Sequence, residues 1–223
     1  MPEHLKAKSP SYGHWRRLVQ ALTFAAVLAT ATHAATARTL RLVALGDSLT
    51  AGLGLAPGKA FPDRLEAALR AKGWDVKVMN AGVSGDTAAD GLARYEWAVP
   101  PDADALIIEL GANDMLRGHP PGATRAALAA ILDRARAAHL SALLAGMRAA
   151  PNLGADYGRE FAAVYTALAK TYGVQLYPFF LDGVAGDPKL NQPDGLHPTA
   201  DGVEVIVQKI LPSVEALLEQ VNR

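Results

Sequence analysis

The segment Leu40-Arg41-Leu42-Val43-Ala44-Leu45-Gly46-Asp47-Ser48-Leu49-Thr50 joins an apolar run to a turn of small and polar residues. A short, continuous run such as Leu40 to Leu45 suits a strand that is buried on both faces. Gly46 ends the run, and a helix is predicted to start directly behind it. Ser48 would then stand above the end of the strand, with its backbone N–H at a helix start, where it can stabilise negative charge. Asp47 or Ser48 could equally be a simple helix cap.

The alternation of apolar runs and helical patterns continues along the chain. Repeated strand-helix-strand units predict an α/β fold, a three-layer α/β/α arrangement around a doubly wound five-stranded parallel sheet. Sites in such sheets lie at the carboxyl ends of the strands, which directs attention to the loops behind them. The other predicted strands are 76–79, 105–110, 140–147 and 174–180, and the predicted helices are 61–71, 124–138, 157–172 and one from Thr199 that Pro212 kinks or breaks.

The first 37 residues have the three-part pattern of a secretory signal peptide. A basic start with Arg16 and Arg17 precedes an uncharged apolar stretch, and small residues lead to Ala37. That stretch is too short to cross a bilayer comfortably, so we expect cleavage after Ala37 and no stable membrane anchor. Cleavage after Ala34 would also satisfy the small-residue rule. The paired arginines leave the twin-arginine route open. The expected organisation is a signal peptide over 1–37 and one α/β domain over 38–223, with the mature protein periplasmic or secreted.

The composition of the mature chain excludes several kinds of function. Residues 38–223 carry 18 Lys and Arg against 21 Asp and Glu, a net charge of −3, and the sequence has no cysteine. A mildly acidic chain without a basic stripe is a poor nucleic-acid binder. The lack of cysteine excludes disulfides and a thiol nucleophile. No His and Asp cluster has metal-ligand spacing, and we expect no metal and no cofactor.

Three further loops behind predicted strands carry candidate residues. Gly82 lies in a Gly-rich turn where a backbone N–H can approach a substrate, although an ordinary turn would look the same. Asn113 follows the third strand, where its amide can donate to an oxyanion or simply form an Asx turn. Asp194 lies three residues before His197, a spacing that lets the carboxylate meet the imidazole and fix its tautomer. His139 lies just before a strand and is interpreted as structural.

Together the four loops resemble the GDSL or SGNH hydrolase family. The matching blocks are Gly-Asp-Ser-Leu at 46–49, Gly82, Gly-Ala-Asn-Asp at 111–114 and Asp-Gly-Leu-His at 194–197. The resemblance covers the whole mature chain and is strongest to the secreted group of acyl-CoA thioesterases, lysophospholipases and arylesterases. It implies a flavodoxin-like SGNH hydrolase fold. It also implies a serine esterase in which Ser48 is the nucleophile, His197 the general base and Asp194 the residue that orients it.

The resemblance further implies an oxyanion hole formed by the N–H groups of Ser48 and Gly82 and by the side-chain amide of Asn113. Asp47 receives no catalytic role. Neither the Gly-x-Ser-x-Gly elbow nor the dinucleotide-binding G-x-G-x-x-G pattern fits, because Thr50 and Pro57 occupy required glycine positions.

Apolar residues near these blocks are candidate acyl-binding residues. Met115 stands where many members of the family have glycine, which affects the expected shape of the pocket. Core packing explains the same residues equally well. The expected partner is a small-molecule acyl ester or thioester, and a monomer is expected. A carbohydrate O-deacetylase with the same triad, or a non-catalytic binding module on the same fold, are the alternatives. The candidate substrate-binding residues are Met115, Leu116, Phe179 and Phe180.

Overall fold

The computed structural model describes residues 38–221, and everything below concerns the compact unit that begins at Thr39. Five parallel strands form one sheet in the order β2-β1-β3-β4-β5. This confirms the predicted doubly wound α/β fold, since 2-1-3-4-5 is the flavodoxin-like order. The signal peptide predicted for residues 1–37 lies outside the described residues. The strands are β1 (Leu40–Gly46), β2 (Val76–Gly82), β3 (Ala105–Glu109), β4 (Ser141–Ala145) and β5 (Gln175–Tyr177).

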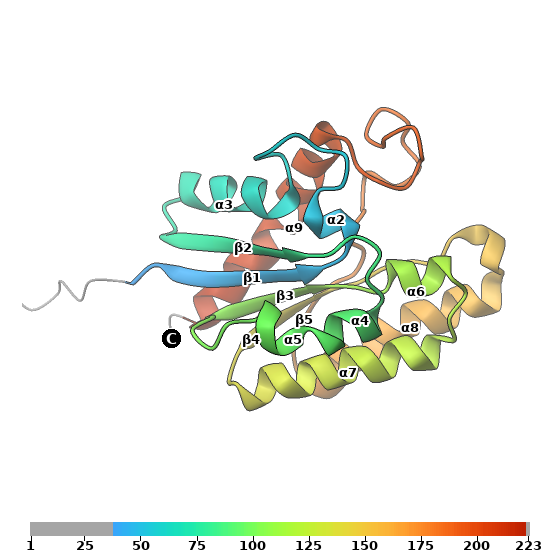
Figure 1. Cartoon of the computed structure of the whole chain (residues 1–223), viewed down its shortest axis with the longest axis horizontal. Helices are drawn as coiled ribbons and strands as arrows, with labels where there is room; N and C mark the ends of the chain where they lie inside the picture. The colour runs from blue at the N-terminus through green and yellow to red at the C-terminus, as the bar shows by residue number, and fades with distance from the viewer. Residues whose placement is uncertain (1–37, 222–223) are drawn as a thin grey trace, which may run out of the picture. The chain divides into compact units, whose positions relative to one another are not determined.

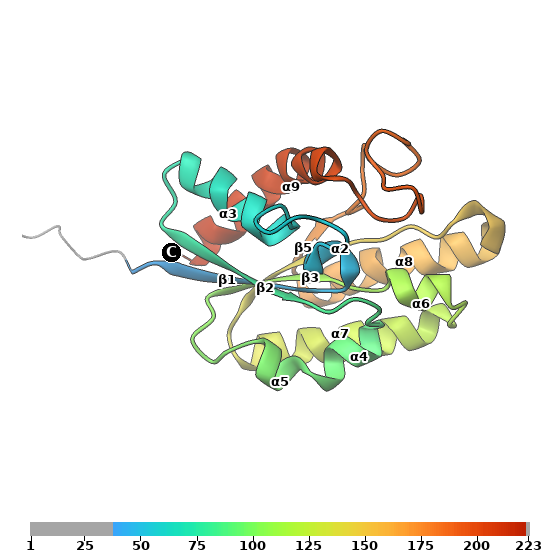
Figure 2. The same ribbon diagram turned by 45° about the horizontal axis from the view of Figure 1, so that its top comes forward.

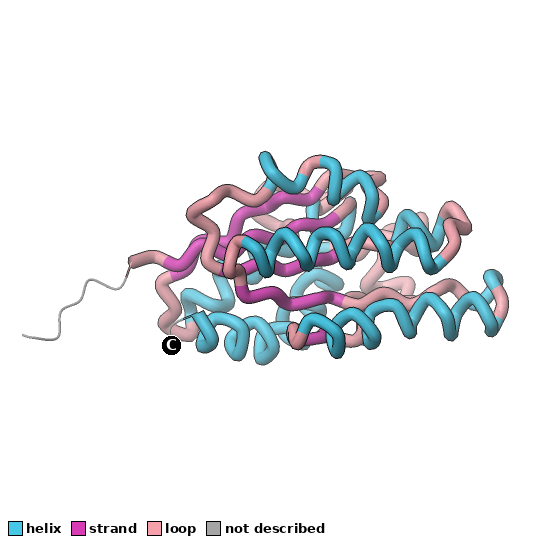
Figure 3. The backbone as a smooth tube through the Cα atoms, turned by 90° about the horizontal axis from the view of Figure 1, so that it is seen from below, coloured by secondary structure: helices cyan, strands magenta, loops and turns pink. Residues whose placement is uncertain are grey.

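Helices cover both faces of the sheet (Figures 1 and 2). On one face, α3 (Phe61–Ala71) packs against α9 (Ala200–Val221). On the other, α7 (Pro121–Ala137) packs against both α8 (Ala155–Tyr172) and α4 (Ala88–Ala93). Figure 3 looks onto this second layer, with the strands behind the helices. Short elements complete the described part of the chain: α2 (Ser48–Ala51), α5 (Tyr95–Ala98), α6 (Ala112–Leu116) and a 3₁₀ turn over Pro151–Leu153.

The core lies between the sheet and these helices. Every residue of the central strand β3 is buried, as the unbroken apolar run predicted, but that strand also carries the buried acid Glu109. The strand order reverses between β1 and β3, because β2 lies on one side of β1 and β3 to β5 follow on the other. In such a sheet this point leaves a crevice at the carboxyl ends of the two strands. The helices α2 and α6 begin at this edge, immediately after β1 and β3 (Figure 1).

The last helix is not broken at Pro212. It runs from Ala200 to Val221, with Pro212 inside it. Proline removes one backbone donor, so the carbonyl of Gln208 has no partner four residues on. Both Pro212 and Gln208 are exposed, and water can satisfy that carbonyl. The opposite face carries the predicted apolar stripe, including Val203, Ile210 and Leu217, and its burial keeps the helix continuous.

Candidate active site

Ser48 is the first residue of the four-residue helix α2, which follows strand β1. Asp47 caps this helix, and its Oδ1 accepts a hydrogen bond of 3.0 Å from the Leu49 N–H. Gly52 ends it in the left-handed conformation, with φ of 82°. The Ser48 N–H lies in the first turn, where a helix amide has no carbonyl partner within the helix. The turn therefore presents both a hydroxyl and a backbone donor at the sheet edge.

Two glycines allow the Ser48 turn to sit directly on the sheet. A Cβ on Gly46 would lie 2.1 Å from the Thr50 hydroxyl oxygen, and one on Gly82 would lie 2.3 Å from the Ala51 nitrogen. Neither separation leaves room for a side chain. The sequence therefore needs glycine at the ends of β1 and β2 for close approach, because any larger residue would push the Ser48 helix away from the loop that follows β2.

Asp194, His197 and Ser48 form a continuous chain of hydrogen bonds. The His197 Nδ1 lies 2.6 Å from Asp194 Oδ2, and the His197 Nε2 lies 2.9 Å from Ser48 Oγ. The N–H groups of His197 and Leu196 also donate to Asp194 Oδ1, at 3.0 and 2.9 Å. The backbone and ring donors of His197 lower the pKa of Asp194 to about 2. An ionised Asp194 accepts from Nδ1–H, which leaves Nε2 free to accept the Ser48 proton.

The loop that carries His197 is tied to the loop behind Ser48 by Gln192. Its side-chain amide donates to the carbonyl oxygens of Leu53, at 2.8 Å, and Pro198, at 3.0 Å. Its backbone N–H donates to the His197 carbonyl at 2.7 Å. The bond to Leu53 joins two loops that are far apart in sequence, and the other two bonds hold the His197 loop itself in shape. The sequence alone gave no signal for Gln192.

The expected oxyanion donors converge on the same edge, but two of them already have acceptors. The Gly82 N–H donates to Asn80 Oδ1 at 3.0 Å. The Asn113 Nδ2 donates to Asp47 Oδ2 at 3.1 Å and to the Asp86 carbonyl at 3.0 Å. The side-chain nitrogen of asparagine carries two hydrogens, so both of its donors are already used in hydrogen bonds. An oxyanion must share or replace one of these bonds.

Two buried carboxyl groups lie beneath the Ser48 turn. Asp47 and Glu109 are both fully buried, and Thr50 Oγ1 donates to Glu109 Oε2 at 2.8 Å. Burial raises the pKa of Asp47 to about 6. Burial, and then the neighbouring Asp47 charge, raise the pKa of Glu109 well above its ordinary value. Glu109 was missed from the sequence, although an acid inside a strand predicted to be buried on both faces was the signal available.

A buried ion pair holds the loop behind β2. Arg94 Nε lies 2.5 Å from Asp86 Oδ2, and the Arg94 guanidinium also donates to the Gly46 carbonyl at 2.9 Å. Both side chains are largely buried, so the pair is shielded from solvent. Arg94 thus connects the loop that carries Asp86 to the end of β1.

A cavity of about 720 Å³ opens beside Ser48 and His197. Met115, Leu116 and Phe179 line it, and the Arg148 guanidinium lies over the Phe179 ring at 4.9 Å. Phe180 was also a candidate substrate-binding residue, but it does not line the cavity. Its side chain is fully buried and packs edge-to-face on Phe61, with ring centroids 5.0 Å apart. Other apolar residues of the cavity are Leu49, Ala112, Met147, Ala149, Ala150, Pro151, Leu181, Ala185 and Leu196.

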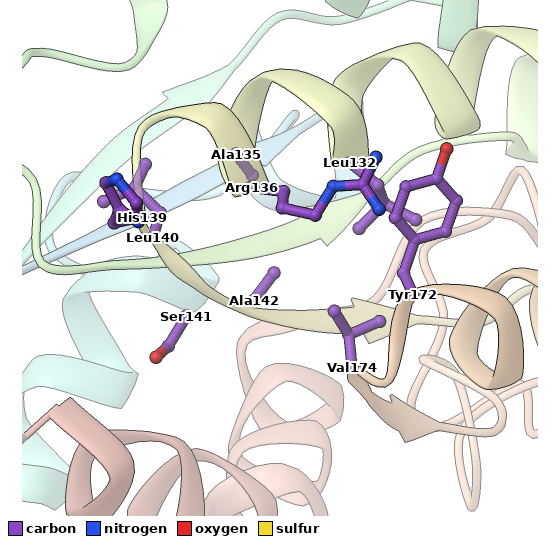
Figure 4. Close-up of a pocket in the computed structure, with 9 residues that line it drawn as sticks. All are labelled: Leu132, Ala135, Arg136, His139, Leu140, Ser141, Ala142, Tyr172 and Val174. Atoms are coloured by element: carbon purple, nitrogen blue, oxygen red, sulfur yellow. The ribbon is translucent and has the colours of Figure 1, made fainter.

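A smaller hollow of about 290 Å³ lies around the start of β4 (Figure 4). His139 and Arg136 line it, together with the ring of Tyr172. His139 adopts the left-handed conformation, with φ of 56°, in the turn between α7 and β4. It therefore stands at the amino end of a strand, whereas Ser48 follows the carboxyl end of one.

Within residues 38–221, no group of three or more His, Cys, Asp or Glu side chains is placed to hold a metal ion. No helix in this described part of the chain is long and apolar enough to cross a membrane.

A doubly wound sheet with a Ser–His–Asp chain at its carboxyl edge defines a hydrolase of the SGNH class. The chain belongs to the GDSL-like lipase/acylhydrolase family, whose sequence model matches residues 44–205. It is an ester hydrolase of that family, as the four sequence blocks predicted.

Similar proteins are esterases and thioesterases. The chain is 39% identical over 188 residues to Esterase TesA of Pseudomonas aeruginosa, which covers 84% of this chain and 92% of that protein. It is 36% identical to the thioesterase 1/protease 1/lysophospholipase L1 of Escherichia coli K12, over 79% of this chain and 84% of the relative. The crystal structure of AlinE4, an SGNH-hydrolase family esterase, superposes with a TM-score of 0.68 at 46% identity, covering 81% and 97% of the two chains.

Proposed function

We propose that this chain is an exported serine esterase and thioesterase that hydrolyses fatty-acyl or aryl esters through an acyl-enzyme on Ser48. The observation that carries the proposal is the unbroken hydrogen-bond chain from Asp194 through His197 to Ser48, which opens onto a largely apolar cavity. The names of the relatives support both an ester and a thioester as substrate.

In this mechanism, Ser48 Oγ attacks the carbonyl carbon of the ester while His197 Nε2 takes the hydroxyl proton. The ionised Asp194 stabilises the imidazolium that results. When the tetrahedral intermediate collapses, the bond to the leaving group breaks and Nε2 gives its proton to the departing oxygen or sulfur. A water molecule then repeats the sequence on the acyl-enzyme, and the carboxylic acid leaves.

Charge on the carbonyl oxygen is stabilised by three donors: the N–H groups of Ser48 and Gly82 and the Nδ2 of Asn113. Preorganised donors of this kind supply a large part of the rate in acyl transfer. Gly82 and Asn113 already donate to acceptors within the protein, so the oxyanion must replace one of these acceptors or share the donor with it. It can do so because a developing negative charge is a stronger acceptor than a neutral carbonyl or amide oxygen.

The cavity predicts a preference for medium or long acyl chains. With p-nitrophenyl esters of rising chain length, kcat/KM is expected to increase beyond the acetate, because each buried methylene contributes about 0.8 kcal/mol. Phe179→Ala should reduce kcat/KM about tenfold for the longer esters and leave the acetate within about twofold, since only the longer chains reach the ring.

Leu53 provides a matched control for Phe179, because it is an exposed apolar residue that does not line the cavity. Leu53→Ala should leave the whole series unchanged. A wild-type optimum at acetate, with no effect of Phe179→Ala on any ester, would instead identify a deacetylase with a shallow site.

Export rests on the basic, apolar and small-residue series that ends at Ala37. Amino-terminal sequencing of the protein from periplasm or medium is expected to begin at Arg38. Intact Met1 in that fraction would show that the leader is not cleaved.

A further inference from the structure

The side-chain nitrogen of Asn113 donates to two acceptors. Asp47 supplies a carboxylate oxygen at 3.1 Å, and Asp86 supplies its backbone carbonyl at 3.0 Å. The oxygen and nitrogen of an amide group have nearly the same shape, so only the surrounding donors and acceptors decide which way the group points. With two acceptors facing it, the nitrogen must point toward Asp47 and Asp86, because the reversed amide would set its oxygen against both.

The Asp47 carboxyl joins two separate elements of the site. Its Oδ1 caps the Ser48 helix by accepting from the Leu49 N–H, while its Oδ2 accepts from Asn113 on α6. The cap therefore uses one oxygen only. The second oxygen accepts the hydrogen bond from Asn113. Because the whole Asp47 side chain is buried, water does not compete for this bond.

We propose that Asp47 is a positioning residue, whose carboxylate fixes the Asn113 amide with its nitrogen toward the oxyanion of the reaction. The inference rests on the proposed role of Asn113 as an oxyanion donor. A hydrogen bond to a charged acceptor is stronger than one to a neutral carbonyl. The bond to Asp47 is therefore retained, and the bond to the Asp86 carbonyl is the one that the oxyanion displaces.

The surroundings of Asp47 suit this role. At about pH 8 the Asp47 carboxyl is ionised, since its pKa is about 6, and an ionised carboxyl only accepts hydrogen bonds. Glu109 lies beside it in the core, and burial together with the Asp47 charge keeps the pKa of Glu109 well above its ordinary value. The Asp86 carbonyl is held in place independently, because the Asp86 side chain is paired with Arg94.

Asp47→Asn separates positioning from helix capping. Asparagine caps a helix as well as aspartate, so the Leu49 bond survives. In that orientation the new amide nitrogen faces the Asn113 nitrogen, and two donors cannot bond to each other. Asp47→Ser is a second variant that also keeps the cap but is too short to bridge to Asn113.

The test is a double-mutant cycle with Asn113→Ala, measured as kcat and KM on a p-nitrophenyl ester at about pH 8, with thermal midpoints. Asp47→Asn and Asp47→Ser are each expected to lower kcat by about 30-fold in the wild-type background, less than the roughly 10²- to 10³-fold loss on removing one oxyanion donor, because Asn113 is misplaced and not absent. KM should stay within about threefold. In the Asn113→Ala background the same substitutions should change kcat by less than about threefold, because the group that Asp47 positions is gone.

Equal losses in both backgrounds would overturn the inference, since Asp47 would then act through something other than Asn113. A wild-type kcat in Asp47→Asn would overturn it as well. Failure of the proposed oxyanion hole looks different: in that case Asn113→Ala alone keeps a wild-type kcat.

Discussion

Ser48→Ala is expected to lower kcat for ester hydrolysis by about 10⁶, as in other serine hydrolases that lose the triad nucleophile. The Ser48 hydroxyl lies 2.9 Å from His197 Nε2, and in the proposed mechanism no acyl-enzyme forms without it. The fold should survive, because the substitution removes one oxygen while the Asp47 cap and the backbone bonds of the short helix remain. The measurement is kcat on a p-nitrophenyl ester, together with the thermal midpoint.

A serine-directed phosphonate supplies the second readout for Ser48. Wild-type protein should gain the mass of one phosphonyl group on Ser48, and Ser48→Ala should gain none. Ser84 is a suitable control, since it is an exposed serine in the loop after β2 at the same edge of the sheet. Ser84→Ala should label and hydrolyse like wild type. A Ser48→Ala activity within about tenfold of wild type would exclude Ser48 as the nucleophile, because loss of the covalent step costs far more.

Asn113→Ala is expected to lower kcat by about 10²- to 10³-fold with little change in KM. The amide binds charge that develops only in the transition state, so its removal acts on kcat more than on substrate binding. The variant should also be less stable, because buried Asp47 loses a partner, and an unsatisfied buried acceptor costs about 1–3 kcal/mol. The comparison must therefore use kcat per folded molecule, measured well below the thermal midpoint.

Asn113→Asp provides the sharper contrast for this position. It keeps the size of the side chain but sets a carboxyl against the Asp47 carboxylate and the Asp86 carbonyl, where two donors are needed. Its kcat should fall at least as far as that of Asn113→Ala. Normal kcat per folded molecule in both variants, with lowered thermal midpoints, would show that Asn113 only shapes the turn after β3.

The inner strands β1, β3 and β4 could be predicted from the sequence because each is a short apolar run that is almost entirely buried. The edge strands β2 and β5 are partly exposed, and their apolar runs are correspondingly shorter or interrupted. The crossover between β2 and β3 could not be predicted. Its helices α4 and α5 have six and four residues, too few to show a helical repeat, and α4 begins with a capping box between Thr87 and Asp90. Of the kink or break expected at Pro212, the break is wrong, because the buried stripe of α9 outweighs the local effect of proline.

From the sequence alone, Ser48, Asn113 and His197 could be expected at one edge of the sheet. They lie in loops that follow predicted parallel strands, and the carboxyl ends of parallel strands lie on the same side. It could not show which hydrogen bonds their donors already make. The bonds from Gly82 to Asn80 and from Asn113 to Asp47 depend on side-chain placement in three dimensions. For the same reason, the sequence could not tell that Phe179 faces the cavity while its neighbour Phe180 packs on Phe61.

The buried acids under the Ser48 turn make the folded protein less stable as the pH rises toward neutral. A folded-state pKa of about 6 for Asp47, against an ordinary value of 3.8, means that the native state binds more protons than the unfolded chain between those values. Stability from this group is thus fully present below pH 3.8, is lost as pH rises to about 6, and the loss amounts to roughly 3 kcal/mol. Glu109 adds a loss of the same sign above pH 4.5. A selection for heat resistance at neutral pH should therefore favour neutral residues at these two positions. At position 47, that gain would come at the expense of turnover.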